Sequence, residues 1–159
     1  LGQRVDAVFS AATFHWIPDH DALFTRLAAA LWPGGKLVAQ CGGSGNVAAV
    51  EAAGRAVSQH EPYAQYLADV TTPLNFQSVE ATTERLKRCG FTDVECWNET
   101  LEVVPEEPES YVGSICLGYL TELLPEEFRA PFVAEVLSLL PSPTAIDYVR
   151  LNIDATRAG

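Results

Sequence analysis

Several features that mark other classes of protein are missing from this sequence. It has no apolar run approaching the ~20 residues of a membrane helix, and its amino end lacks the charged and apolar regions of a signal peptide. Positive charge is scarce, since ten Lys and Arg stand against 21 Asp and Glu and give a net charge of −11. Phosphate binding requires clustered cations, so nucleic acid is an unsuitable partner, as is a substrate with several negative charges. We therefore expect a soluble protein with neither nucleic-acid nor membrane partners.

Paired cysteines and recognisable metal ligands are also missing. No C-x-x-C motif occurs, and each cysteine falls within an expected strand or helix, so we expect reduced thiols and, from them, a cytoplasmic location. The group His15, Asp19, His20 and Asp21 fits no usual ligand spacing, so we expect no metal site. The four cysteines are Cys41, Cys89, Cys96 and Cys116.

Methionine is absent even at position 1, and an apolar segment typical of a strand begins within a few residues of the start. We therefore expect the sequence to begin inside a larger domain. A sheet ending at residues 4–10 would also expose an edge strand, which folded proteins usually cover. What is present suffices for a core, because 48% of the 159 residues are hydrophobic.

The segment 5–16, VDAVFSAATFHW, is the first candidate for a functional site. Its apolar beginning predicts a strand buried in a parallel sheet. The strand gives way to Ser10, Ala11 and Ala12, small residues that allow a ligand to approach the backbone, and then to His15 and Trp16. Open α/β sheets bind ligands beyond the carboxyl ends of their strands, so we expect the site there.

The next segment completes a right-handed βαβ unit. Asp19 is a suitable N-cap for a helix whose apolar stripe includes Leu23, Leu27 and Leu31 and which we expect to end at Pro33. Residues 36–41 then predict a second, parallel strand. The glycines that follow, Gly42, Gly43 and Gly45, predict a second wall of the same crevice.

The remainder predicts helices followed by a β-hairpin. A helix is expected over 46–60, then aromatic residues that cover the site, and a helix capped by Ser78 and ended by Gly90. Strands are expected over 92–104 and 145–155, the latter with clean alternation and antiparallel pairing to the former. Between them, 105–140 predicts helices, one beginning at Pro125 and kinked or split by Pro131.

The chain resembles the second half of a class I S-adenosylmethionine-dependent methyltransferase, in the small-molecule branch that includes trans-aconitate methyltransferase. Three segments carry the resemblance: DAVFSAATFHWIPDH at 6–20, LWPGGKLVAQ at 31–40 and ERLKRCGFTDVE at 84–95. It implies an α/β, Rossmann-like sheet, partial because it holds only strands four to seven, with an antiparallel terminal hairpin. The implied domains are 1–104 with 142–159 for the α/β part and 105–141 for a helical insertion or lid.

The resemblance also implies S-adenosyl-L-methionine as cofactor, but the sequence departs from the family pattern in one respect. No G-x-G-x-x-G loop occurs, and the family places that loop and the acidic ribose ligand upstream of these segments. The amino-terminal cofactor-loop half is therefore expected to be absent from this sequence. We expect the missing segment, or an oligomeric partner, to cover the exposed sheet edge.

Within that family the exit of the fourth strand lies beside the methionine part of the cofactor, which implies contacts from Ser10, Ala11 and Ala12 through their backbone. A tight turn of small residues is the alternative. Trp16 could place its ring near the sulfonium, or could simply be a core residue. His15 could orient or deprotonate a substrate, or could be fixed by hydrogen bonds under the lid.

Tyrosines in and before the insertion are candidates for the substrate pocket, although aromatic residues at helical spacing equally serve plain packing. Arg55 and Arg150 could meet a substrate carboxylate, or could be surface charges. The candidate substrate-binding tyrosines are Tyr63, Tyr66, Tyr111 and Tyr119.

The sequence thus predicts methyl transfer to the oxygen or nitrogen of a small molecule, with this chain alone inactive. The alternative is a non-catalytic α/β module of the same fold that acts in protein–protein interaction. A nicotinamide-dependent oxidoreductase is disfavoured, because no Tyr-x-x-x-Lys pair follows a strand.

Overall fold

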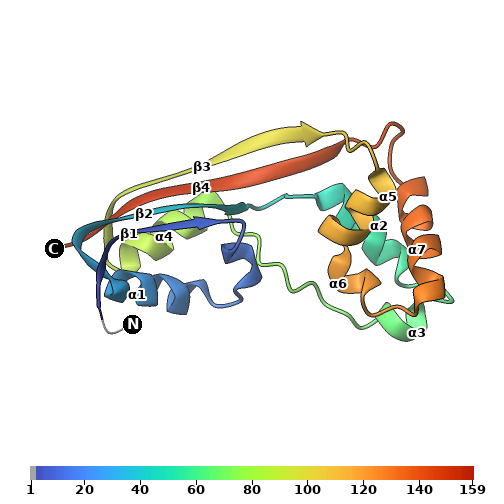
Figure 1. Ribbon diagram of the computed structural model, residues 1–159, viewed down its shortest axis with the longest axis horizontal. Coiled ribbons are helices and arrows are strands. Elements are labelled where there is room, and N and C mark those ends of the chain that lie inside the picture. Colours follow the sequence, from blue (N-terminus) through green and yellow to red (C-terminus); the bar gives the residue numbers. More distant parts are fainter. Residues whose placement is uncertain (1–2) are drawn as a thin grey trace. The chain divides into compact units, whose positions relative to one another are not determined.

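The computed structural model describes residues 3–159, which form two compact units. The first, called here the sheet unit, contains the described residues up to Asn46 with Leu74–Thr100 and Val149–Gly159. The second, the helical unit, contains Val47–Pro73 and Leu101–Tyr148. In chain order the elements (Figure 1) are β1 (Val5–Ala11), the 3-10 turn η1 (Phe14–Trp16), α1 (His20–Ala30), β2 (Leu31–Gly42), α2 (Ala48–Val57), α3 (Ala64–Leu67), α4 (Val79–Arg88), β3 (Phe91–Val103), α5 (Pro108–Tyr111), the π-helical turn η2 (Val112–Cys116), α6 (Gly118–Thr121), α7 (Glu126–Ser138) and β4 (Ile146–Arg157).

Four strands form one sheet in the order β1-β2-β4-β3. Strands β1 and β2 are parallel, with Ser10 opposite Ala39, and β2 and β4 are antiparallel, with Ala39 opposite Ile153. Strands β3 and β4 lie side by side and run in opposite directions (Figure 1). The predicted α/β class, with a parallel pair and an antiparallel terminal hairpin, is therefore confirmed.

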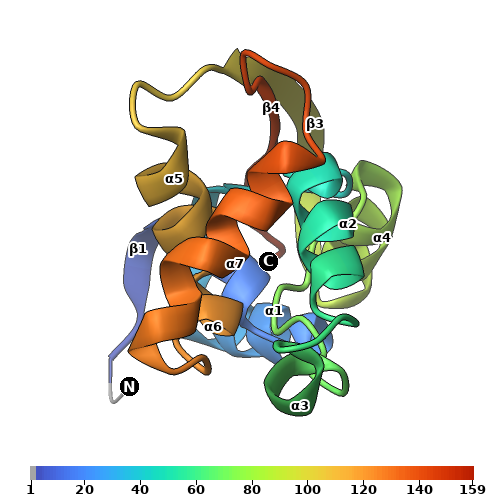
Figure 2. The ribbon, with the colours of Figure 1, turned by 90° about the vertical axis from the view of Figure 1, so that its right-hand side faces the viewer.

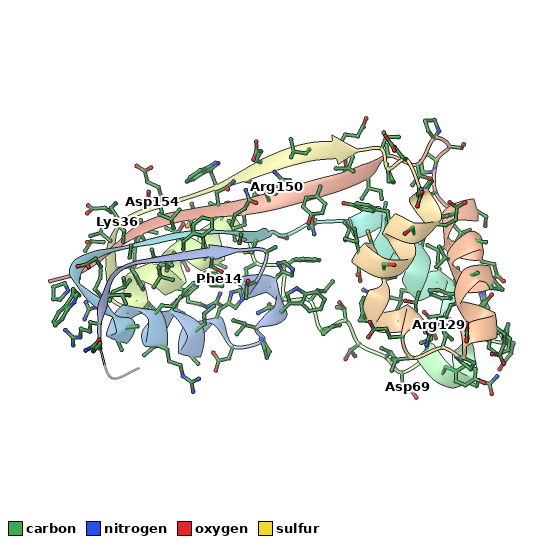
Figure 3. The ribbon with its side chains drawn as sticks, viewed as in Figure 1. Phe14, Lys36, Asp69, Arg129, Arg150 and Asp154 are labelled. Carbon is green, nitrogen blue, oxygen red and sulfur yellow. The ribbon has the colours of Figure 1, made fainter. Side chains whose placement is uncertain are left out.

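One face of the sheet packs on helices α1 and α4 (Figure 1). Phe24 of α1 and Leu86 of α4 are fully buried there. The predicted alternation of β4 explains its part in this layer, because every second residue from Val149 to Ala155 is at most 9% exposed. On the other face, Lys36 of β2 and Asp154 of β4 form an ion pair at 3.1 Å (Figure 3).

No element of the sheet unit covers that other face among the described residues. Phe9 on the edge strand β1 is 77% exposed, and Val38, its partner across the ladder, is 41% exposed. This face of the sheet therefore presents two neighbouring apolar side chains to solvent in the described chain.

Helix α1 begins as predicted and ends earlier than predicted. The side chain of Asp19 accepts the amide of Ala22 at 2.9 Å, which caps the first turn. The helix ends at Ala30 instead of at Pro33, because a residue before proline favours extended backbone and Leu31 already pairs with Val5 in the sheet. Leu31 is therefore buried in β2 and is not part of the helical stripe.

Helix α4 follows the local signals of its sequence. The Ser78 hydroxyl accepts the amide of Ala81 at 3.2 Å, and Gly90, with φ +90°, lies just past the end of the helix. Arg88 pairs with Asp21 of α1 at 2.8 Å. This ion pair ties the two helices that cover the sheet.

The helical unit is organised by the packing of α2 on α7 (Figure 2). Gly54 of α2 leaves the space that the Leu117 side chain fills. Residues 47–73 pack with this unit, which differs from the sequence-based boundaries that assign them to the α/β part. Helix α7 is not split at Pro131, as it runs unbroken to Ser138. Pro131 is exposed, so the carbonyl that loses its partner can bind water.

Candidate functional site

The backbone beyond β1 makes a tight turn of small residues. Ala12 adopts φ +53°, and its amide donates to the carbonyl of Gln40 at 2.8 Å. Ser10 is half-buried, whereas Ala11 and Ala12 are exposed. The three residues predicted to contact the cofactor thus follow one another at the end of a parallel strand, and two of them are open to solvent.

The chain then enters the short turn η1, which is anchored by its aromatic residue. Phe14 is 4% exposed and packs edge-to-face on Phe24 of α1, with ring centres 5.9 Å apart (Figure 3). Trp16, two residues later, is 51% exposed. The prediction that Trp16 is available to a ligand is compatible with this exposure, and the alternative of a core tryptophan does not fit it.

His15 joins the ends of the two parallel strands. Its Nδ1 accepts the amide of Gly42 at 3.0 Å, so the neutral ring carries its proton on Nε2. Burial lowers the pKa of His15, and the neighbouring His20 lowers it further. The neutral ring can donate a hydrogen bond from Nε2, but it can accept a proton only by losing the Gly42 contact. This geometry favours a histidine that positions groups over one that acts as a base.

Phe76 closes over the end of β2. Its ring lies 5.6 Å from that of His15, and a Cβ atom at Gly42 would overlap it. The adjacent Gly43 forms a parallel bridge to Gln77. Cys41, the last side chain of β2, is buried, and burial raises the pKa of its thiol to about 11. The end of β2 is therefore an uncharged, buried environment formed by glycine backbone and an aromatic ring.

His20 lies next to Phe14 and His15. The sequence suggested no role for it, because the metal site that it could have joined was judged not to fit. It is 4% exposed, and its Nε2 donates to the carbonyl of Phe14 at 2.9 Å. Burial is the largest cause of its lowered pKa. Among residues 3–159 no group of three or more His, Cys, Asp and Glu side chains could hold a metal ion.

The segment before α4 was missed by sequence reasoning. Asn75 and Gln77 hydrogen-bond to the loop after β1 or to one another. No periodicity or motif marks them, and the one available signal was the aromatic Phe76 between them.

The four candidate substrate tyrosines all lie in the helical unit, but they do not share one pocket. Tyr63 is 1% exposed and donates to Glu135 at 2.7 Å, and burial raises its pKa to about 12. Tyr66 lies near Phe128, as Tyr63 does. For Tyr63 this environment favours the alternative of plain packing.

Tyr119 and Tyr111 line separate cavities. Tyr119 donates to Glu51 at 2.9 Å and, with Arg55, lines a cavity of about 290 Å³. Burial and the nearby Glu51 raise its pKa to about 12, so its hydroxyl stays protonated at neutral pH. Tyr111 lines a more open hollow of about 360 Å³ together with Ile115.

Comparison with known proteins connects these features to one family. A family model described as a methyltransferase domain matches residues 2–39. The trans-aconitate 2-methyltransferase of Mycobacterium tuberculosis H37Ra is 30% identical over 140 residues, which are 85% of this chain and 53% of that protein. These matches support the resemblance of the chain to part of a class I S-adenosylmethionine-dependent methyltransferase.

Solved methyltransferase structures have the same fold. Phosphoethanolamine N-methyltransferase 2 of Haemonchus contortus, in complex with phosphomonomethylethanolamine and S-adenosylhomocysteine, aligns with a TM-score of 0.51 and 21% identity over 98% of this chain and 34% of that chain. The YcgJ protein of Bacillus subtilis aligns with a TM-score of 0.56 and 8% identity over 99% of this chain and 65% of that one. These alignments confirm the Rossmann-like methyltransferase fold.

The resemblance noted in the sequence is thus confirmed, and the methyltransferase family uses S-adenosylmethionine as its cofactor. The chain spans about half the length of the curated relatives it matches. The family match over residues 2–39 coincides with β1, α1 and most of β2, so it includes the loop that carries His15 and Trp16. No helix among the described residues is both long and apolar enough to span a bilayer.

Proposed function

We propose that the whole protein transfers a methyl group from S-adenosylmethionine to an oxygen or nitrogen of a small molecule. The single observation that carries this proposal is the end of β1, where a small-residue turn and an exposed tryptophan lie beside the glycine end of β2. The curated relatives, named for trans-aconitate, favour a carboxylate oxygen as the acceptor, whereas the net charge of −11 disfavours an acceptor with as many carboxylates as trans-aconitate has.

Four residues of this chain fit one part of a cofactor site. The exposed backbone of Ala11 and Ala12, with Ser10 before them, can lie against the methionine part, because no large side chain blocks it. The indole face of Trp16 can attract a positive sulfonium, worth ~1 kcal/mol or more when water is excluded. Bound S-adenosylmethionine supplies a methyl group activated for in-line displacement. The protein's own task is then to align the acceptor and to exclude water.

We assign His15 the role of a neutral hydrogen-bond donor that orients the acceptor. Its Nδ1 is engaged by Gly42, which leaves Nε2–H for an acceptor oxygen. A carboxylate acceptor is already ionised at neutral pH and requires no base.

The replacement His15→Gln tests this assignment. We expect kcat to fall by less than about tenfold, because a glutamine can still accept the Gly42 amide and donate one hydrogen bond, whereas loss of a general base costs about 10²–10⁴-fold. Steady-state rates at pH 7.5 on the full-length protein decide between the two. A loss of 10²-fold or more that added imidazole reverses would establish a base instead.

The helical unit supplies the remaining parts of the proposal. We assign residues 105–141 the role of a lid. We assign the four candidate tyrosines of the helical unit the role of lining a substrate pocket, and Tyr119 is the best supported of them. Tyr119 lines a cavity of about 290 Å³ with Arg55, a cation suited to a substrate carboxylate. Tyr63 is the weakest of the four tyrosines, because it is buried against Phe132 with its hydroxyl on Glu135.

Ligand binding by the full-length protein tests the proposed function. We expect calorimetry to show S-adenosylhomocysteine binding at micromolar concentration. No binding at high micromolar concentration, together with retained folding, would leave the alternative of a non-catalytic module of methyltransferase fold that acts through protein contacts.

A further inference from the structure

The loop after β1 is fastened by a residue from a distant part of the sheet unit. The amide of Asn75 donates to the carbonyl of His15 at 2.7 Å. Its side-chain Nδ2 donates to two more carbonyls of the same loop, those of Ile17 at 3.1 Å and Pro18 at 3.0 Å. One asparagine therefore fixes three carbonyls of residues 15–18.

The direction of these hydrogen bonds is dictated by a group that can only donate. The Arg85 guanidinium has no acceptor, and its Nη1 donates to Oε1 of Gln77 at 3.0 Å. The amide nitrogen of Gln77 must therefore face away from Arg85, and it donates to Oδ1 of Asn75. Asn75 is left with its NH₂ group toward the loop, where two carbonyls require donors. The chain of bonds has one consistent orientation from helix to loop.

Arg85, the first donor in this series of hydrogen bonds, is itself held in place. Arg85 donates through Nε to Asp21 at 3.1 Å, and Arg88 reaches the other oxygen of the same carboxylate. The Arg85 side chain is 20% exposed, which limits its screening by water. The two arginines hold the pKa of the Asp21 carboxyl below its usual range, so this anchor stays ionised.

We propose that Asn75 and Gln77 are positioning residues that hold the loop 13–18 in the conformation required for cofactor binding. This inference rests on the proposed function, because the loop carries His15 and Trp16. Asn75 fixes the loop backbone, while Gly42 fixes the His15 ring, so the two contacts together set the place of Nε2 and of the backbone that carries the indole. Neither residue needs to touch the substrate.

Two nearly isosteric replacements in the full-length protein test the proposal. Asn75→Asp puts carboxylate oxygens against the carbonyls of Ile17 and Pro18. Gln77→Glu retains and strengthens the contact with Arg85 but removes the donor to Asn75, so it keeps the test decisive if Asn75→Asp fails to fold. The matched control is Gln65→Glu, an exposed amide of the helical unit that also donates to a carbonyl, that of Pro62.

We expect S-adenosylhomocysteine affinity to fall about 100-fold for Asn75→Asp and about tenfold for Gln77→Glu, with no change for Gln65→Glu. Amide exchange of residues 13–17 and of Gly42 should quicken in both variants, while exchange in α4 does not. Quickened loop exchange with unchanged affinity would overturn the positioning role, since the network would then be only structural. If the wild-type protein binds no S-adenosylhomocysteine, the proposed function fails, and this inference fails with it.

Discussion

Replacing Gly42 with alanine should lower the free energy of unfolding by about 3 kcal/mol, at the upper end of the range for overpacking. A Cβ atom there overlaps the ring of Phe76 and lies 3.0 Å from Nδ2 of Asn46. Phe76 would have to move, and with it Asn75 and Gln77 on either side. The Gly42 amide would also shift from His15, so S-adenosylhomocysteine binding should weaken in parallel. Urea denaturation and calorimetry of the full-length protein measure the two effects.

A second glycine provides the control for this prediction. A Cβ atom at Gly118 meets nothing within 4 Å, so Gly118→Ala should leave stability unchanged or slightly raised. Adding Phe76→Leu to Gly42→Ala removes ring atoms from the overlap, and the pair should then be more stable than the sum of the single changes. Strict additivity would show that Phe76 is not the obstacle.

The sequence predicted best those features that depend on neighbouring residues. Asp19 and Ser78 cap their helices because a short polar side chain reaches an amide three residues on. Gly90 follows α4 with a positive φ that glycine adopts freely. Strand β4 was recognised because alternation is a direct consequence of strand geometry.

Individual side-chain contacts between distant segments were not predicted, although the pairing of distant strands was. Asn75 contacts Ile17 across 58 positions, and no pattern within 74–78 indicates a partner. The aromatic residues between positions 63 and 76 were expected to cover one site together. In the structure Tyr63 packs in the helical unit, whereas Phe76 packs against His15. The family resemblance places α2 in the α/β part, whereas in the structure α2 packs with the helical unit.

Replacing Phe9 with glutamate should destabilise the full-length protein on the order of 4 kcal/mol, because it would place a carboxylate in a covered apolar face. The sequence predicts that a missing segment or an oligomeric partner covers the edge strand β1, and we propose that the same partner covers the sheet face of Phe9 and Val38. In this chain alone Phe9 is 77% exposed, and the same change should cost little there. Chemical denaturation of both proteins gives the difference.

An exposed leucine at the end of α7 serves as the control, since Leu139 is 58% exposed and Leu139→Glu should be near neutral in the full-length protein. Equal, small effects of both replacements would show that the Phe9 face stays open in the whole protein. Measuring stability at several protein concentrations then distinguishes the two candidates that could cover this face. A stability of the wild-type protein that falls with protein concentration indicates a second copy on this face, whereas a constant value indicates the protein's own chain, because only association depends on concentration.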